Sequence, residues 1–164
     1  HDQAEAMSMA DKVILIRDGQ VEQEGTPDVL YEKPGTAFSA AFVGTPPMNL
    51  LKTIATDNGG AIAGENKTPV LATTPHPVLL GIRPEHISIS DSRGIAAELI
   101  TADYLGAETI VTARIGNQDV LIRANGRVSV PQPIAARLAW QGSDAHVFDS
   151  DTGKRDENIK AFDI

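Results

Sequence analysis

The sequence TIVTARI at residues 109–115, followed by Gly116 and Asn117, gives the clearest indication of the architecture. Apolar and polar side chains partly alternate along it, which is typical of a half-buried β-strand. Gly116 and Asn117 favour a hairpin turn into a second apolar run at 119–123. The stretch therefore predicts a β-hairpin inside a mainly β domain.

A similar pattern of short predicted strands separated by turn residues covers most of the chain after the double proline at 46–47. From Met48 onward, short apolar runs alternate with Gly, Pro, Asn and Asp at intervals typical of small β-barrels and sandwiches. The final dozen residues are polar, and we expect them to be frayed. The predicted strands cover residues 49–56, 61–63, 70–73, 78–82, 86–90, 96–105, 108–115, 119–123, 135–140 and 146–148.

The first fifty residues differ from the rest because helical signals dominate them. A helix is predicted over 3–10, and a hairpin is predicted from the runs at 12–16 and 21–25. Thr26 followed by Pro27 opens a second helix, because proline suits the first helical position. A third helix is predicted at 36–43. We expect residues 1–50 to form a small α/β unit and residues 51–164 a separate β domain.

Composition excludes several classes of function. The formal net charge is -8, with 14 Lys and Arg against 22 Asp and Glu, which disfavours nucleic acid as a partner. The chain has no cysteine, so thiolate metal sites and thiol nucleophiles are excluded. No metal site is expected, because His76 stands between two prolines without a second ligand at suitable spacing. The chain starts at His1, and we expect it to be a piece of a longer protein.

The sequence lacks the loop that nucleotide hydrolysis requires. Such a loop ends in Gly-Lys-Ser/Thr, because backbone N–H groups must surround the phosphates while the lysine reaches their charge. The only Gly-Lys pair is Gly153 and Lys154, and Arg155 follows it in a polar segment. We therefore expect no catalysis and no cofactor for this chain alone.

Short distinctive blocks follow one another along nearly the whole chain, and together they resemble one family. They read HDQAEAM at 1–7, ADKVILI at 10–16, DG at 18–19, GTP at 25–27, LYEKP at 30–34, FVG at 42–44, MN at 48–49, GIRPEH at 81–86, LGAE at 105–108 and HVFD at 146–149. In this order they resemble the C-terminal part of ABC-importer ATP-binding subunits of the sugar and glycerol-phosphate class. Among the subfamilies, the sn-glycerol-3-phosphate importers are the most similar.

The resemblance implies a fold and a parent protein. Residues 1–50 would be the remnant of the nucleotide-binding domain, and residues 51–164 an OB-like regulatory β-barrel called the TOBE domain. The parent would bind ATP and Mg²⁺, and hydrolysis would drive import of sn-glycerol 3-phosphate or a sugar. It would act as a homodimer at the cytoplasmic face of the membrane, with permease subunits and a regulatory protein as partners. This portion would serve regulation and dimer contact.

The resemblance also implies roles for individual residues. His1 matches the switch histidine, which touches the γ-phosphate of ATP in the parent. Arg83, Glu85 and His86 match a motif that links the barrel to the ATPase body. They would serve as a latch between the domains, as a ligand contact, or as a structural turn around Pro84.

The residues leave a second interpretation open, in which the chain is a free-standing OB-like sensor of a small oxyanion or sugar. Arg114, Arg123, Arg127 and Arg137 could supply the cationic groups of such a site. A micromolar titration of sn-glycerol 3-phosphate, phosphate, molybdate or maltose on this chain alone would contradict a pure scaffold. No binding, together with sedimentation as a dimer, would contradict the sensor.

Overall fold

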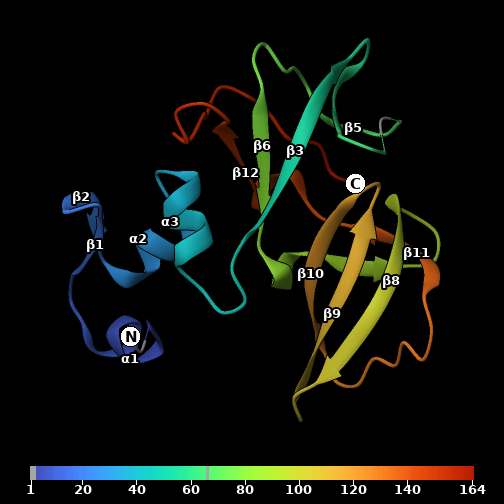
Figure 1. The fold of residues 1–164 in the computed structure, drawn as a ribbon, viewed down its shortest axis with the longest axis horizontal. Coiled ribbons are helices and arrows are strands. Elements are labelled where there is room, and N and C mark those ends of the chain that lie inside the picture. Colours follow the sequence, from blue (N-terminus) through green and yellow to red (C-terminus); the bar gives the residue numbers. More distant parts are fainter. Residues whose placement is uncertain (1–2, 66) are drawn as a thin grey trace.

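The computed structural model describes residues 3–65 and 67–164, and strands dominate it, as predicted (Figure 1). Two curled five-stranded sheets are formed after residue 48, and every strand pair in them is antiparallel. The first sheet consists of β3 (Asn49–Thr56), β4 (Gly59–Ile62), β5 (Pro69–Leu71), β6 (Val78–Ile82) and β12 (Ala145–Asp149). Its order is β12-β6-β3-β4-β5.

The second sheet contains the hairpin predicted from residues 109–123. It consists of β7 (Ser88–Ser90), β8 (Ile95–Tyr104), β9 (Glu108–Ile115), β10 (Gln118–Asn125) and β11 (Ile134–Ala139). Its order is β10-β9-β8-β11-β7, and β9 pairs with β10 through Ile115 and Gln118 beside the turn. Gly116 has a φ of 58°, which a glycine adopts without strain.

The apolar faces of the two sheets share one core. Leu80 of β6, Val111 of β9, Ile122 of β10 and Leu138 of β11 belong to it, and none is more than 1% exposed. Trp140 also lies there, at 3% exposure. Burial of such side chains is the main favourable term in folding, at about 25 cal/mol per Å² of apolar surface.

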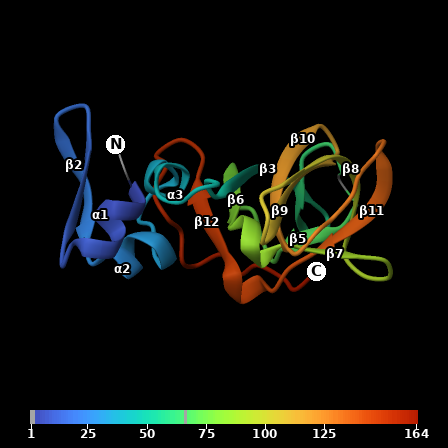
Figure 2. The same cartoon turned by 90° about the horizontal axis from the view of Figure 1, so that it is seen from below.

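The N-terminal segment forms a small unit at one end of the molecule, where the β1–β2 hairpin projects farthest from the two sheets (Figure 2). Its helices and hairpin confirm the four elements predicted from the sequence. At the hairpin turn, Asp18 and Gly19 both have positive φ, of 51° and 78°, as a tight two-residue turn requires. The elements are α1 (Gln3–Met9), β1 (Val13–Arg17), β2 (Gln20–Gly25), α2 (Pro27–Glu32) and α3 (Ala37–Phe42).

Helix α3 joins this unit to the first sheet. Ala40 of α3, Met48 and Phe148 of β12 form a buried cluster with exposures of 0%, 4% and 0%. In both views α3 lies beside β6 and β12 (Figures 1 and 2). The other face of the unit has its own cluster of Leu15, Leu30 and Val43.

Two local predictions were wrong. The run at 86–90 is not one strand, because Pro84–His86 forms a 3-10 turn and β7 begins only at Ser88. Pro84 has no N–H to donate to a strand ladder, and its fixed φ suits the start of a helical turn.

The C-terminal segment is ordered rather than frayed. The Phe162 N–H donates to the Val70 carbonyl at 2.9 Å, the Ile164 N–H donates to the Trp140 carbonyl at 2.9 Å, and Ile159 is only 7% exposed. These long-range bonds could not be read from a polar composition. Among residues 3–65 and 67–164, no helix has the length and apolar character that crossing a membrane would need.

Candidate functional site

Arg83 connects the N-terminal unit to the barrel. It follows β6 directly, and its side chain is buried, with the residue only 1% exposed. Its Nη1 donates to the carbonyl of Val43, and its Nη2 donates to the carbonyl of Tyr31 at 2.6 Å. The guanidinium carbon also lies 3.9 Å from the centre of the Tyr31 ring. We call the contact of Arg83, Glu85, Tyr31, Val43 and Gly44 the Arg83 junction.

Glu85 completes the junction from the barrel side. The Tyr31 hydroxyl donates a hydrogen bond to Oε1 of Glu85. Burial, followed by this bond and the charge of Glu85, raises the pKa of Tyr31 to about 12, so the phenol stays neutral at physiological pH. Burial also lowers the pKa of Arg83 from its usual value. The predicted pair Arg83 and Glu85 therefore meets the same residue of α2.

Gly44 leaves the space that Arg83 occupies. Its φ of 112° lies in a region that other residues rarely adopt. A Cβ at this position would lie 2.8 Å from Nη1 of Arg83 and 3.1 Å from a carbon of the Tyr31 ring. The glycine of the block FVG at 42–44 thus has a physical reason: it leaves room for the Arg83 guanidinium to reach the carbonyl of Val43.

His86, the third predicted residue, does not join the junction contacts. Its backbone N–H closes the 3-10 turn on the Arg83 carbonyl at 3.0 Å, and its side chain is exposed. It lies on the wall of a neighbouring cleft that Lys33, Arg83 and Arg155 also line. His86 therefore differs in position from Arg83 and Glu85.

Asn49 is a second connector, which sequence reasoning missed. It is 8% exposed, its Nδ2 donates to the carbonyls of Ile82 and Leu121, and its Oδ1 accepts from the Leu121 N–H at 2.8 Å. One amide side chain thus ties β3 to β6 and to β10 of the second sheet. The block MN at 48–49 was visible in the sequence, but its partner lies 72 residues away.

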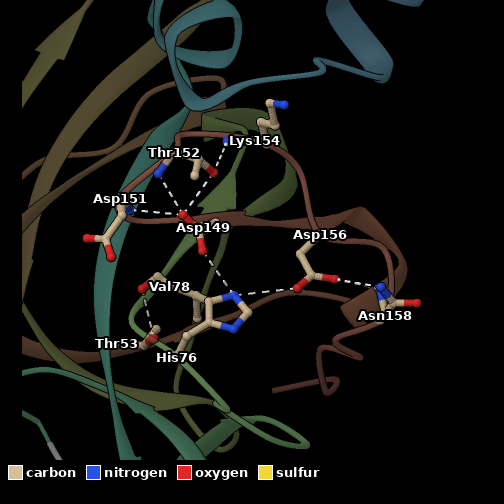
Figure 3. Close-up of polar contacts among 9 residues, drawn as sticks. All are labelled: Thr53, His76, Val78, Asp149, Asp151, Thr152, Lys154, Asp156 and Asn158. Atoms are coloured by element: carbon tan, nitrogen blue, oxygen red, sulfur yellow. Dashed lines mark hydrogen bonds and ion pairs between the residues drawn. The ribbon is translucent and has the colours of Figure 1, made fainter.

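His76 is held by two acids that are distant in sequence. Its Nε2 lies 3.3 Å from Oδ2 of Asp149 and 3.5 Å from Oδ2 of Asp156 (Figure 3). Hydrogen bonds from the backbone and hydroxyl of Thr152 lower the pKa of Asp149. The group attaches the C-terminal segment to the loop before β6. Among the described residues, no three His, Cys, Asp or Glu side chains are arranged to hold a metal ion.

The four arginines of the sensor interpretation have separate partners. Arg114 pairs with Asp119 at 2.8 Å, Arg123 pairs with Glu108 at 3.3 Å, Arg127 lies over the Tyr104 ring, and Arg137 donates to the Gly94 carbonyl at 2.6 Å. Each is thus engaged with a different partner among the described residues. This arrangement does not favour an oxyanion site at the barrel mouth.

His1, the predicted switch histidine, lies outside the described residues. Gly153 and Lys154 form part of a turn after β12, where Lys154 pairs with Thr36 rather than opening a helix. This geometry does not fit a phosphate loop.

Comparisons with known proteins identify the domains. Residues 44–87 match the MalK OB fold domain, and residues 80–148 match the TOBE domain. The chain is 38% identical to an uncharacterized ABC transporter ATP-binding protein of Sinorhizobium fredii, over 94% of this chain and 43% of that protein. It is 36% identical to the sn-glycerol-3-phosphate import ATP-binding protein UgpC of Chromobacterium violaceum, over 98% of this chain and 46% of that protein.

The UgpC protein of Salmonella choleraesuis gives a similar result, with 35% identity over 94% of this chain and 46% of that protein. The chain thus spans about half the length of the curated relatives that it matches. The two domain matches run without a gap from residue 44 to residue 148. The chain therefore carries a MalK OB fold domain and a TOBE domain, and it matches the C-terminal portion of ATP-binding proteins of ABC importers.

Proposed function

We propose that the chain is the regulatory and dimerisation portion of an ATP-hydrolysing subunit that powers uptake of sn-glycerol 3-phosphate or a sugar. On this proposal residues 1–50 complete a nucleotide-binding domain, and residues 51–164 form the regulatory barrel. The observation that carries it is the Arg83 junction, because a buried guanidinium bonded to the backbone of α2 and α3 is suited to transmit movement between these two parts.

The proposed role is mechanical rather than chemical. Arg83 and Glu85 fix the barrel to α2, so a rotation of the ATPase body on nucleotide binding would carry the barrel with it. A control protein docked on the barrel could then favour the open or the closed state of a dimer.

His1 would act in the complete subunit as the switch histidine. Its imidazole can donate one ring N–H to a phosphate oxygen while the other nitrogen is held by a neighbour. ATP with Mg²⁺ would supply the free energy for closure, and the groups that bind both would come from the upstream half of the subunit. Permease subunits would place this portion at the cytoplasmic face of the membrane.

The exposed face of the β1–β2 hairpin supports an upstream partner. Ile14, Ile16 and Val21 are 51%, 62% and 59% exposed on adjacent strands. Side chains of this kind gain free energy when another element covers them. The rest of a nucleotide-binding domain is the cover that we propose.

A chimera tests the proposal. This chain would replace the matching C-terminal portion of the Salmonella choleraesuis UgpC, and uptake of labelled sn-glycerol 3-phosphate would be measured in cells without their own subunit. We expect uptake and ATP hydrolysis in the chimera. Arg83→Met should retain hydrolysis while reducing its coupling to uptake, and Arg137→Met, on the barrel surface, should change neither. A chimera that is folded but neither hydrolyses ATP nor supports uptake would contradict the proposal.

A further inference from the structure

A cleft between the N-terminal unit and the barrel lies beside the Arg83 junction. It has a volume of about 430 Å³, which falls in the range of small-molecule sites. Its walls come from the end of α2, from the turn after β6, from the 3-10 turn Gly142–Asp144 and from the C-terminal segment. Three regions that are distant in sequence, around residues 31–33, 83–86 and 143–155, therefore meet around one small space.

The charge of this cleft differs from that of the whole chain. Lys33, Arg83 and Arg155 supply three permanent positive charges to its lining, and Glu32 and Asp144 supply two carboxylates. The chain as a whole carries a net charge of -8. Cations outnumber acids in the lining, although acids outnumber cations in the sequence. Such a local excess attracts anions.

Within the described part of the chain, two cations of the cleft have no strong acidic partner. Arg155 is 24% exposed, and its Nε lies 3.6 Å from Glu157, whose side chain is 78% exposed. An exposed pair of this kind is weak. Lys33 has an exposed side chain at the end of α2. The Arg155 backbone N–H donates to the Gly35 carbonyl at 2.9 Å, which holds the C-terminal segment close to this end of α2.

Two buried nitrogen atoms of the lining residues also lack a hydrogen-bond partner among the described residues. They are Nε of Arg83 and Nδ1 of His146. Buried polar atoms are nearly always satisfied, so two unpaired atoms on residues that line one cleft are consistent with a partner that the chain itself does not supply. A ligand with several acceptor oxygens suits a guanidinium and an imidazole.

The pKa of His146 shows that the charges around it are mainly positive. Burial, followed by the charges of Arg155, Arg83 and His86, lowers its pKa to about 4, against a smaller opposing effect of Asp144. The imidazole is therefore neutral at pH 7 and adds no charge of its own. An anion placed in the cleft would oppose the three cations and raise the pKa of His146.

We propose that this cleft binds a small oxyanion, such as the phosphate or carboxylate group of a metabolite, between Lys33, Arg83 and Arg155. The bound ligand bridges α2, the barrel and the C-terminal segment. Because it would bind the assembled arrangement better than separated parts, it stabilises the attachment of the N-terminal unit to the barrel. This function goes beyond that of a mechanical connector.

Calorimetry and NMR on this chain test the proposal. Inorganic phosphate, sn-glycerol 3-phosphate and glycerate distinguish a phosphate from a carboxylate, and glycerol is the neutral control. We expect saturable binding of at least one anion with a Kd below about 10 mM, and a rise in the pKa of His146 of about one unit or more. Glycerol and sodium chloride should produce neither.

Variants locate the site. The double variant Lys33→Gln and Arg155→Gln should weaken binding at least about tenfold, because it removes two charge-assisted contacts. The matched double variant Lys52→Gln and Arg127→Gln removes the same charge at exposed positions outside the cleft and should keep the affinity within about twofold. If the first pair proves unstable, Lys33→Gln alone makes the same comparison.

Three results would overturn the proposal. One is the absence of saturable heat and of shifts at His146 for all three anions at low ionic strength. Another is an equal loss of affinity in the two double variants, which would mean general charge attraction. The third is binding that leaves the pKa of His146 unchanged, because the ligand would then lie elsewhere.

Discussion

The N-terminal unit and the barrel bury apolar surface to very different extents. Among the described residues, the core shared by the two sheets contains nineteen buried side chains, whereas the cluster of Leu15, Leu30 and Val43 contains three. The N-terminal unit also exposes Ile14, Ile16 and Val21 on its hairpin. A unit with so small a core is stable only through its contacts with neighbours. The Arg83 junction and the contact of Ala40 with Phe148 provide those contacts here.

This difference teaches that the two regions should unfold separately. The barrel should behave as one cooperative unit, while the N-terminal unit opens at a lower free energy. The first three predictions below try to separate the regions or change the support between them. The last prediction tests what covers the exposed hairpin of the N-terminal unit in a complete subunit.

Arg83→Met should have the largest effect. The change keeps much of the volume but leaves the carbonyls of Tyr31 and Val43 without their donor and removes the contact with the Tyr31 ring. We expect a loss of about 3 kcal/mol in the opening free energy of the N-terminal unit. Amide hydrogen exchange would measure it as faster exchange between residues 13 and 43.

The control for this variant is Arg137→Met. Arg137 also donates to a carbonyl, that of Gly94, but it is an exposed residue of β11. Its loss should change exchange little in either region. Equal acceleration of exchange in the barrel and the N-terminal unit of Arg83→Met would show that the two regions form a single cooperative unit.

The pH dependence of stability should show the second largest effect, through His146. Its pKa is about 4 in the folded chain and about 6.5 when unfolded, so the unfolded chain binds more protons between these values. The free energy of unfolding should therefore fall as the pH drops from about 6.5 to 4, by as much as about 3 kcal/mol. Above pH 7 this contribution should be constant.

His146→Leu isolates that contribution. Urea unfolding of both proteins across this pH range would give the difference, because other acid-titrating groups, such as Asp149, are common to both. The curves of free energy against pH should diverge below about pH 6.5, with the variant falling less steeply. Parallel curves would show that His146 is protonated in the folded chain.

The sequence predicted the barrel better than its connections, and particular residues show why. Periodicity and turn chemistry are local, so β3 and the hairpin of β9 and β10 could be placed from a few neighbouring residues. The block GIRPEH marked Arg83 as important, but nothing in it identified Tyr31, which lies 52 residues earlier.

Long-range polar contacts account for the other failures. His76 appeared to lack ligands or partners because Asp149 and Asp156 lie more than seventy residues further along the chain. The backbone of the C-terminal segment pairs with β5 and Trp140. The composition of a segment does not reveal such pairing, and the polar composition therefore led to the wrong prediction of a frayed end.

Gly44→Ala should have a smaller effect than the loss of Arg83. A Cβ at a φ of 112° is strained and would press on Nη1 of Arg83 at 2.8 Å. We expect a loss of about 2 kcal/mol, again in the N-terminal unit. Hydrogen exchange would measure it, with Gly106→Ala as the control for strain, because a Cβ at Gly106 meets nothing within 4 Å. A loss confined to the barrel would contradict the assignment of Gly44 to the junction.

The smallest effect in this chain is expected at Ile16, and it tests what covers the hairpin. Ile16 is 62% exposed while its neighbour Leu15 is 6% exposed, so Ile16→Thr should change the unfolding free energy by less than about 0.5 kcal/mol and Leu15→Ala by about 2 kcal/mol or more. In the chimera with the upstream half of UgpC, the proposed cover would bury Ile16, and Ile16→Thr should then cost about 1 kcal/mol or more. Denaturant unfolding of this chain, its two variants, the chimera and the Ile16→Thr chimera measures these costs. An Ile16→Thr cost that stays small in the chimera would mean that the hairpin face is exposed in the complete subunit as well, and the proposed cover would be wrong.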